Sequence, residues 1–120
     1  MSERTRILLV DDDPSVITLL TRALGNWGYE VSSAASAEAA LDRMVGPAFD
    51  LLIVDKCLPG MSGADLMARA QSHWPNIRTL LITADLDLDL DFPVKPTRAL
   101  LKPFPNLDEV KTAVKQALEA

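Results

Sequence analysis

The amino-acid sequence predicts an α/β fold, in which helices cover both faces of a doubly wound, five-stranded parallel sheet. Short apolar runs alternate along the chain with segments of helical periodicity, and the connections between them are short. Some of these runs, such as Leu51 to Val54, are apolar without interruption, which is typical of strands buried on both faces. We therefore expect a single domain that spans residues 1–120.

Composition excludes several classes of function. The 120-residue chain carries a net charge of −5, and an acidic surface attracts nucleic acid poorly, so we expect no direct nucleic-acid binding. No apolar stretch approaches the roughly 18 residues of a membrane helix, and the N-terminal residues show no signal-peptide pattern. These features predict a cytoplasmic protein without a membrane partner. Cys57 is the only cysteine, which excludes an internal disulfide and a thiolate metal cluster.

The first half of the chain alternates strand and helix. Strands are expected at residues 6–10, 29–34 and 51–54, and the second is more polar and therefore nearer an edge. Asp13, which precedes a proline, and Ser36 are expected to cap the two intervening helices. The apolar stripe of the first helix is formed by Val16, Leu20, Leu24 and Trp27. Gly25 and Gly28 are expected to end this helix.

The second half continues the alternation with one interruption. A helix is expected over residues 63–74, a strand over 77–82, a short strand over 99–101, and a last helix over 107–118 capped by Asn106. The expected buried stripe of the last helix is Leu107, Val110, Val114, Ala117 and Leu118.

The interruption lies between the strands at 77–82 and 99–101. Residues 85–91 read DLDLDLD, and Pro93 and Pro96 follow, so we expect an atypical or missing fourth helix. One interpretation is an acidic loop. The other is a surface specialised for a partner or for self-association through the alternating leucines, which would give a homodimer.

Polar residues stand at the ends of four predicted strands. They are Asp11 with Asp12, then Asp55, Thr83 and Lys102. Because the carboxyl ends of parallel strands share one edge of the sheet, we expect these side chains to form one site. Three close carboxylates require a cation, and oxygen ligands suit Mg²⁺, while a lysine and a hydroxyl would hold an anion. This set is suited to the transfer of a phosphoryl group to an aspartate.

Four segments together resemble the receiver domain of two-component response regulators, the CheY-like family with a flavodoxin-like fold. They are ILLVDDDP, LLIVDKCLPGMSG, LLITA and LLKPF, in the order of the family. The resemblance implies that Asp55 accepts a phosphoryl group from a histidine kinase or phosphotransfer protein. It also implies that Thr83 and Lys102 contact the phosphoryl oxygens and that the Lys102–Pro103 peptide bond is cis.

The resemblance further implies the ligands of the metal ion and the output of the domain. Mg²⁺ (or Mn²⁺) would be bound by Asp11, Asp12, Asp55 and the backbone carbonyl of Cys57. Such a domain catalyses only its own phosphorylation and dephosphorylation, so we expect no enzyme in the ordinary sense and no other cofactor. Its phosphorylated state would act on a downstream protein or effector domain that the sequence does not identify.

Two positions concern how phosphorylation is reported. Ala99 stands three residues before the lysine, where the family places an aromatic switch residue, so that no ring is present to rotate. Asp85, two residues after Thr83, is a candidate for influencing the water that hydrolyses an acyl phosphate. We therefore assign Asp85, Ala99 and Pro103 to switching or modulation.

Three alternative functions follow from the same residues. A receiver-like interaction module that signals without phosphorylation would explain Ala99 and the unusual segment. A hydrolase with an aspartyl-phosphate intermediate would need a general acid soon after Asp55, and neither Lys56 nor Cys57 supplies one. An FMN-binding protein is disfavoured because three carboxylates repel phosphate and no phosphate-binding loop is visible.

Overall fold

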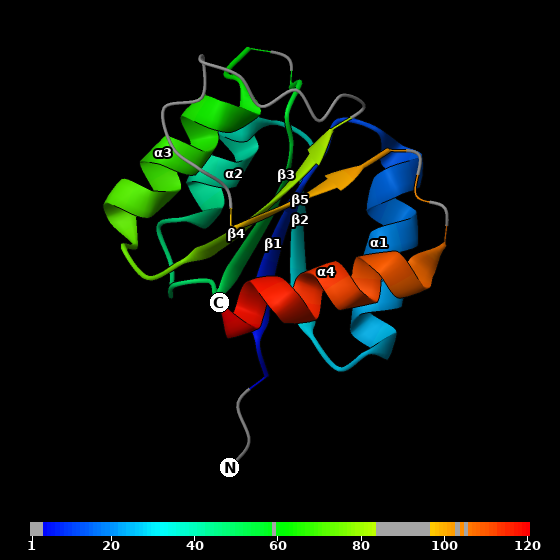
Figure 1. The fold of residues 1–120 in the computed structure, drawn as a ribbon. Coiled ribbons are helices and arrows are strands. Elements are labelled where there is room, and N and C mark those ends of the chain that lie inside the picture. Colours follow the sequence, from blue (N-terminus) through cyan, green and yellow to red (C-terminus); the bar gives the residue numbers. More distant parts are fainter. Residues whose placement is uncertain (1–3, 59, 84–96, 103, 105) are drawn as a thin grey trace.

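The computed structural model of the 120-residue chain describes residues 4–58, 60–83, 97–102, 104 and 106–120. Five parallel strands form one sheet in the order β2-β1-β3-β4-β5 (Figure 1). The strands are β1 (Arg6–Val10), β2 (Glu30–Ala34), β3 (Leu51–Asp55), β4 (Arg78–Thr83) and β5 (Arg98–Leu101). The expected five-stranded parallel sheet is confirmed, and the polar strand β2 lies at an edge, as predicted.

Helices cover both faces of the sheet, which confirms the doubly wound arrangement (Figure 1). They are α1 (Pro14–Asn26), α2 (Ala37–Arg43), α3 (Gly63–His73) and α4 (Leu107–Glu119). Alternate strand residues point to opposite faces, so that Leu8 packs with α2 and α3, whereas Ile7 and Leu9 pack with α1 and α4. Because both faces are covered, β1 and β3 are buried along almost their whole length.

Side chains at the helix N-termini accept hydrogen bonds from backbone amides that would otherwise lack a partner. Asp13 accepts from Ser15, Ser36 from Ala39, and Asn106 from Glu109. These three predicted caps are confirmed. The sequence reasoning did not identify the fourth, Ser62, whose side chain accepts from Asp65 at the start of α3.

Two expectations about helices need correction, although Gly28 does follow the end of the first helix as predicted. Helix α1 continues through Gly25 to Asn26, because glycine weakens a helix without ending it; the left-handed residue after the helix is Gly28, at φ +95°. Leu107 is 37% exposed rather than part of the buried stripe, because it is the first residue of α4 and the face toward the sheet begins at Val110.

Strand boundaries differ from the predicted ranges by one residue at several ends. β2 begins at Glu30, β4 covers Arg78–Thr83, and β3 extends to Asp55, which pairs with Ile82. The predictions for residues 85–91, including the atypical or missing fourth helix, and the predictions for Asp85 and Pro103 lie outside the described residues. None of the helices in the described part of the chain is long and apolar enough to span a membrane.

Candidate functional site

The predicted site residues lie at the carboxyl edge of the sheet. Asp11 and Asp12 follow β1, while Asp55 and Thr83 are the last residues of β3 and β4. Lys102 follows β5, and its backbone N–H donates to the carbonyl of Thr83 at 2.8 Å. The parallel topology therefore brings four separate segments of the chain to one edge.

Three carboxylates form a cluster at this edge. One oxygen of each of Asp11, Asp12 and Asp55 lies within 4.8 Å of the others, a spacing that suits joint coordination of a single small cation. Their exposure differs: the Asp11 side chain is fully buried, that of Asp55 is 13% exposed, and Asp12 is exposed. The cluster thus reaches from the sheet to solvent.

Asp11 is held by hydrogen bonds at both its backbone and its carboxylate. Its backbone N–H donates to the carbonyl of Ala34 at 3.2 Å, and its Oδ1 accepts from the backbone N–H of Asp13 at 2.9 Å. The second oxygen, Oδ2, accepts from Lys102 Nζ at 2.7 Å. A buried carboxylate requires such partners, since an isolated buried charge is strongly unfavourable.

Lys102 bridges two of the three carboxylates. Its ammonium lies 2.7 Å from Asp11 Oδ2 and 3.3 Å from Asp55 Oδ2. Burial works to lower the pKa of Lys102, but the hydrogen bond and charge of Asp11, followed by those of Asp55, outweigh it and raise the pKa. The lysine therefore remains cationic at neutral pH.

The pKa of Asp55 is shifted in the same direction for different reasons. Burial raises the pKa of this carboxyl most, the nearby charge of Asp11 raises it further, and Lys102 opposes both effects. Within the described part of the chain, Lys102 forms ion pairs with two of the three carboxylates, and its single charge does not neutralise the cluster. The site consequently favours the arrival of a further positive charge, as a metal site requires.

The segment after Asp55 passes very close to the start of α3. The Gly63 N–H donates to the carbonyl of Lys56 at 3.1 Å, and a Cβ atom at position 63 would overlap the carbonyl oxygen of Asp55. On the other side, the Lys56 N–H donates to the carbonyl of Ile82 at 2.8 Å. The backbone of Asp55 is thus confined between α3 and β4, a contact that sequence reasoning missed.

Comparison with known proteins assigns this arrangement to a family. Residues 7–115 match the response regulator receiver domain. The chain belongs to this family. Receiver domains act in two-component signalling, and the CheY-like, flavodoxin-like fold expected from the sequence is confirmed.

Individual relatives match this receiver domain over nearly its whole length. It is 35% identical over 116 residues to sporulation initiation phosphotransferase F of Bacillus subtilis, which covers 94% of this chain and 93% of that protein. A CheY-like receiver domain protein from Methanospirillum hungatei superposes with a TM-score of 0.87 at 28% identity, covering 98% of this chain and 95% of that one. Response regulator TrrA of Thermotoga maritima, in complex with Mg²⁺–BeF, has a TM-score of 0.84 at 32% identity, covering 94% of this chain and 98% of that one.

The structure also describes two further predicted site residues of the receiver domain, Cys57 and Ala99. The Cys57 N–H donates to Asp55 Oδ1 at 3.4 Å, and its thiol belongs to an exposed residue. Ala99 is partly buried in β5 and packs against the core on the α2 and α3 side of the sheet. Asp85 and Pro103 lie outside the described residues.

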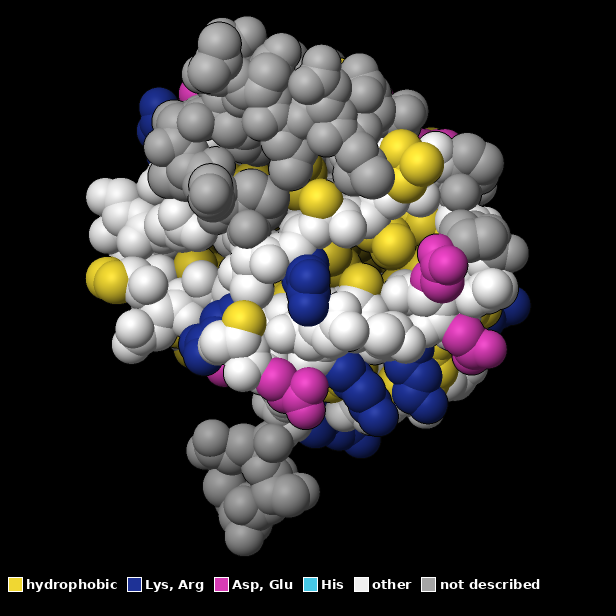
Figure 2. Space-filling view, in the orientation of Figure 1, with side chains coloured by type: hydrophobic (Ala, Val, Ile, Leu, Met, Phe, Trp, Pro, Cys, Tyr) yellow, Lys and Arg dark blue, Asp and Glu magenta, His cyan; other side chains and the backbone are white. Residues whose placement is uncertain are grey.

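An apolar hollow adjoins the site beside Lys102, between α1 and α4. Sequence reasoning did not identify it, because its apolar residues come from distant segments. It is lined by Asp13, Ser15, Val16, Leu19, Lys102, Phe104, Asn106 and Leu107. Over α4, Figure 2 shows Lys and Arg side chains interspersed with Asp and Glu, so the charge of this face is mixed.

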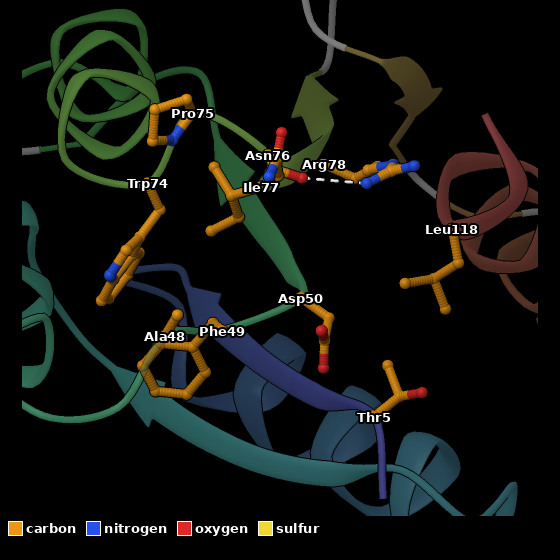
Figure 3. Close-up of a pocket in the computed structure, with 10 residues that line it drawn as sticks. All are labelled: Thr5, Ala48, Phe49, Asp50, Trp74, Pro75, Asn76, Ile77, Arg78 and Leu118. Atoms are coloured by element: carbon orange, nitrogen blue, oxygen red, sulfur yellow. Dashed lines mark hydrogen bonds between the residues drawn. The ribbon is translucent and has the colours of Figure 1, made fainter.

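A second recess lies at the opposite, amino edge of the sheet. Figure 3 shows the residues that line it. The rings of Phe49 and Trp74 meet there edge to face, with centroids 5.8 Å apart. The Arg78 guanidinium donates to the carbonyl oxygens of Asn76 and Ala120. These contacts join the start of β4 to the end of α4.

Proposed function

We propose that this receiver domain accepts a phosphoryl group on Asp55 from the phosphohistidine of a histidine kinase or phosphotransfer protein. A carboxylate oxygen of Asp55 attacks phosphorus, the P–N bond breaks, and the imidazole leaves with the electron pair. The product is an aspartyl phosphate. The observation that best supports the proposal is the Lys102 ammonium, 3.3 Å from Asp55 and 2.7 Å from Asp11.

We assign the metal ligands to Asp11, Asp12, Asp55 and the backbone carbonyl of Cys57, with Mg²⁺ or Mn²⁺ as the ion. The oxygen-only donor set and the 4.8 Å limit on its spacing fit a hard divalent cation. When bound, the ion supplies positive charge that offsets the charge of the phosphoryl oxygens. The likeness to TrrA, whose structure contains Mg²⁺–BeF, supports this assignment.

In this proposal Lys102 and Thr83 bind the phosphoryl oxygens. The raised pKa of Lys102 keeps its ammonium charged, so that it can exchange a carboxylate partner for a phosphoryl oxygen without losing a proton. Thr83 is 2% exposed at the end of β4, and its hydroxyl can donate a hydrogen bond. The two residues are joined through the 2.8 Å backbone hydrogen bond from Lys102 to Thr83.

The output of the domain is a change in its protein-interaction surface rather than a released product. We propose that residues 1–120 act as a single cytoplasmic receiver domain, which transfers the phosphoryl group only to itself and later hydrolyses it. The relative named sporulation initiation phosphotransferase F supports a place in a phosphorelay. The downstream partner is a protein or effector domain, and self-association remains one form that the output can take.

A second candidate function is signalling without phosphorylation. Ala99 favours it, because a methyl group in β5 cannot exchange between two positions as an aromatic ring can. In that case the acid cluster would still bind Mg²⁺, but no phosphoryl group would accumulate on Asp55.

Intact mass after incubation with acetyl phosphate and Mg²⁺ distinguishes the two functions. The wild type should gain the mass of one phosphoryl group, and Asp55→Asn should gain none. If neither protein gains mass while calorimetry shows that the wild type binds Mg²⁺, the phosphorylation-independent module is the better description.

A further inference from the structure

Two threonines at the start of the β4–β5 pair exchange hydrogen bonds. The Thr79 N–H donates to the hydroxyl oxygen of Thr97 at 3.0 Å, and the Thr97 N–H donates to the hydroxyl oxygen of Thr79 at 3.0 Å. Thr79 is fully buried, one of few buried polar residues in the described chain. Each hydroxyl oxygen thus accepts the backbone N–H of the opposite threonine, a role that a backbone carbonyl has in a regular sheet.

The exchange lies directly in register with the strand pair. β4 and β5 pair from Leu80 with Arg98 to Thr83 with Leu101, so that Thr79 and Thr97 stand opposite each other one residue earlier. At the other end of the pair, the Lys102 N–H donates to the carbonyl of Thr83 at 2.8 Å. The threonine exchange therefore begins the ladder that ends at Lys102.

Strand β5 has little else to specify its register. It has only four residues, lies at the edge of the sheet, and contains no fully buried side chain. Register in a sheet is set mainly by which residues are buried, and this strand offers only the partly buried Ala99 and Leu100. In addition, residues 85–91 carry a second alternating apolar pattern earlier in the sequence.

The register of β5 determines where Lys102 stands. A slip of one residue would move Lys102 by about 3.3 Å along the sheet. Its ammonium lies 2.7 Å from Asp11 and 3.3 Å from Asp55, and such a displacement would break at least one of these contacts. We propose that Thr79 and Thr97 are positioning residues, which set the register of β5 and thereby place Lys102 at the phosphoryl site. This inference rests on the proposed function of Asp55 and Lys102.

Substitutions that remove one hydroxyl at a time test the proposal. Thr79→Val and Thr97→Val delete the acceptor and keep the shape of the side chain, whereas Thr79→Ser and Thr97→Ser keep the acceptor. Thr21→Val serves as the matched control, because the Thr21 hydroxyl is buried without a hydrogen-bond partner in the described part of the chain. The measured quantity is the rate of phosphorylation of the intact protein by acetyl phosphate, at saturating donor and Mg²⁺, together with the half-saturating donor concentration.

We expect each valine variant to lower the saturated rate about tenfold, because a displaced Lys102 no longer stabilises the transferring group. Each serine variant and Thr21→Val should stay within about twofold of the wild type. A threonine pair that only stabilised the fold would lower the unfolding temperature without changing the saturated rate of protein that remains folded. Circular dichroism at the assay temperature establishes the folded fraction.

Three outcomes overturn the inference. They are a wild-type rate in the folded valine variants, a loss in Thr79→Val that Thr79→Ser does not restore, and an equal loss in Thr21→Val. If Thr79→Val does not fold, the less buried Thr97→Val and Thr97→Ser decide the question. Failure of the proposed function gives a different result, because the wild type itself would then not be phosphorylated.

Discussion

Both edges of the sheet carry charged side chains, but the two edges differ in how these charges are paired. At the amino edge, Arg6 donates to Glu30 and to the carbonyls of Pro47 and Ala48, and its guanidinium lies 4.4 Å from the centroid of the Phe49 ring. Arg78 similarly donates to carbonyls at the start of β4 and at the end of α4. These cations join segments of the fold, and their donors are occupied by the protein itself.

At the carboxyl edge, Lys102 pairs with Asp11 and Asp55, and Asp12 lies beside them in the same cluster of carboxylates. The acid that lies nearest the lysine, Asp11, is fully buried, and the pKa of Asp55 is raised by burial and by the charge of Asp11. The comparison supports the proposal that the two edges have different roles: the charges at the amino edge are paired within the fold, whereas the carboxylates of the proposed reactive site leave an excess of negative charge that a cation would offset.

Removing the cation at each edge should separate these roles most strongly. Lys102→Met should slow phosphorylation by acetyl phosphate by about 100-fold, because the transferring group loses its positive partner. Arg78→Met, the matched change at the amino edge, should lower the unfolding temperature but leave the rate within about twofold. Equal losses of rate in the two variants would remove the distinction between the edges.

A methyl group at Gly63 tests how closely the backbone confines Asp55. Gly63→Ala places a Cβ against the Asp55 carbonyl, and we expect a loss of about 1–3 kcal/mol in the free energy of unfolding. We also expect phosphorylation to slow about tenfold, because Asp55 is displaced. Gly25→Ala is the control: its Cβ would meet nothing within 4 Å, so the helix should gain up to about 1 kcal/mol. Urea unfolding measures the change in stability, and the phosphorylation assay measures the change in rate. A Gly63→Ala variant with the stability and rate of the wild type would contradict the confinement of the Asp55 backbone.

Metal binding should depend on the carboxyl edge alone. Asp12→Asn should weaken Mg²⁺ about tenfold in isothermal titration calorimetry, because an exposed ligand loses its charge while the fold is undisturbed. Asp50→Asn, at the amino edge, should bind Mg²⁺ as the wild type does. If Asp50→Asn weakens Mg²⁺ binding and Asp12→Asn does not, the ion binds at the amino edge, which would contradict the proposed metal site.

The smallest expected effect is that of Asp55→Asn on the unfolding temperature of the metal-free protein. A folded-state pKa of Asp55 above its unfolded value means that protonation favours folding at low pH and that this benefit is lost as the pH rises through the folded-state pKa. Ionised Asp55 therefore destabilises the metal-free protein at neutral pH. Asp55→Asn should raise the unfolding temperature by a few degrees at pH 7 and by less at acid pH. A lower unfolding temperature at pH 7 would show that the pairing of Asp55 with Lys102 outweighs its burial.

Much of the fold could be predicted because it follows from local pattern. Continuous apolar runs identified β1 and β3, and Asp13, Ser36 and Asn106 were recognisable caps because capping depends on residue type at one position. The gathering of strand-end residues followed from the parallel topology alone.

Other features required the folded chain. Asp11 and Asp12 are adjacent and identical in type, yet one is fully buried and the other exposed, since only the path of the loop after β1 decides between them. The contact of Gly63 with Asp55 and the exchange between Thr79 and Thr97 join segments that are distant in sequence. The signal for the second was a threonine within the apolar run of β4, which sequence reasoning did not use.

The most direct test of the reactive carboxyl edge is to locate the phosphoryl group chemically. Borohydride reduces an aspartyl phosphate to homoserine, so the wild type treated with acetyl phosphate and Mg²⁺ can be reduced, digested and sequenced by mass spectrometry. The account predicts homoserine at position 55. Homoserine at Asp50 or at any other carboxylate, with none at position 55, would contradict it.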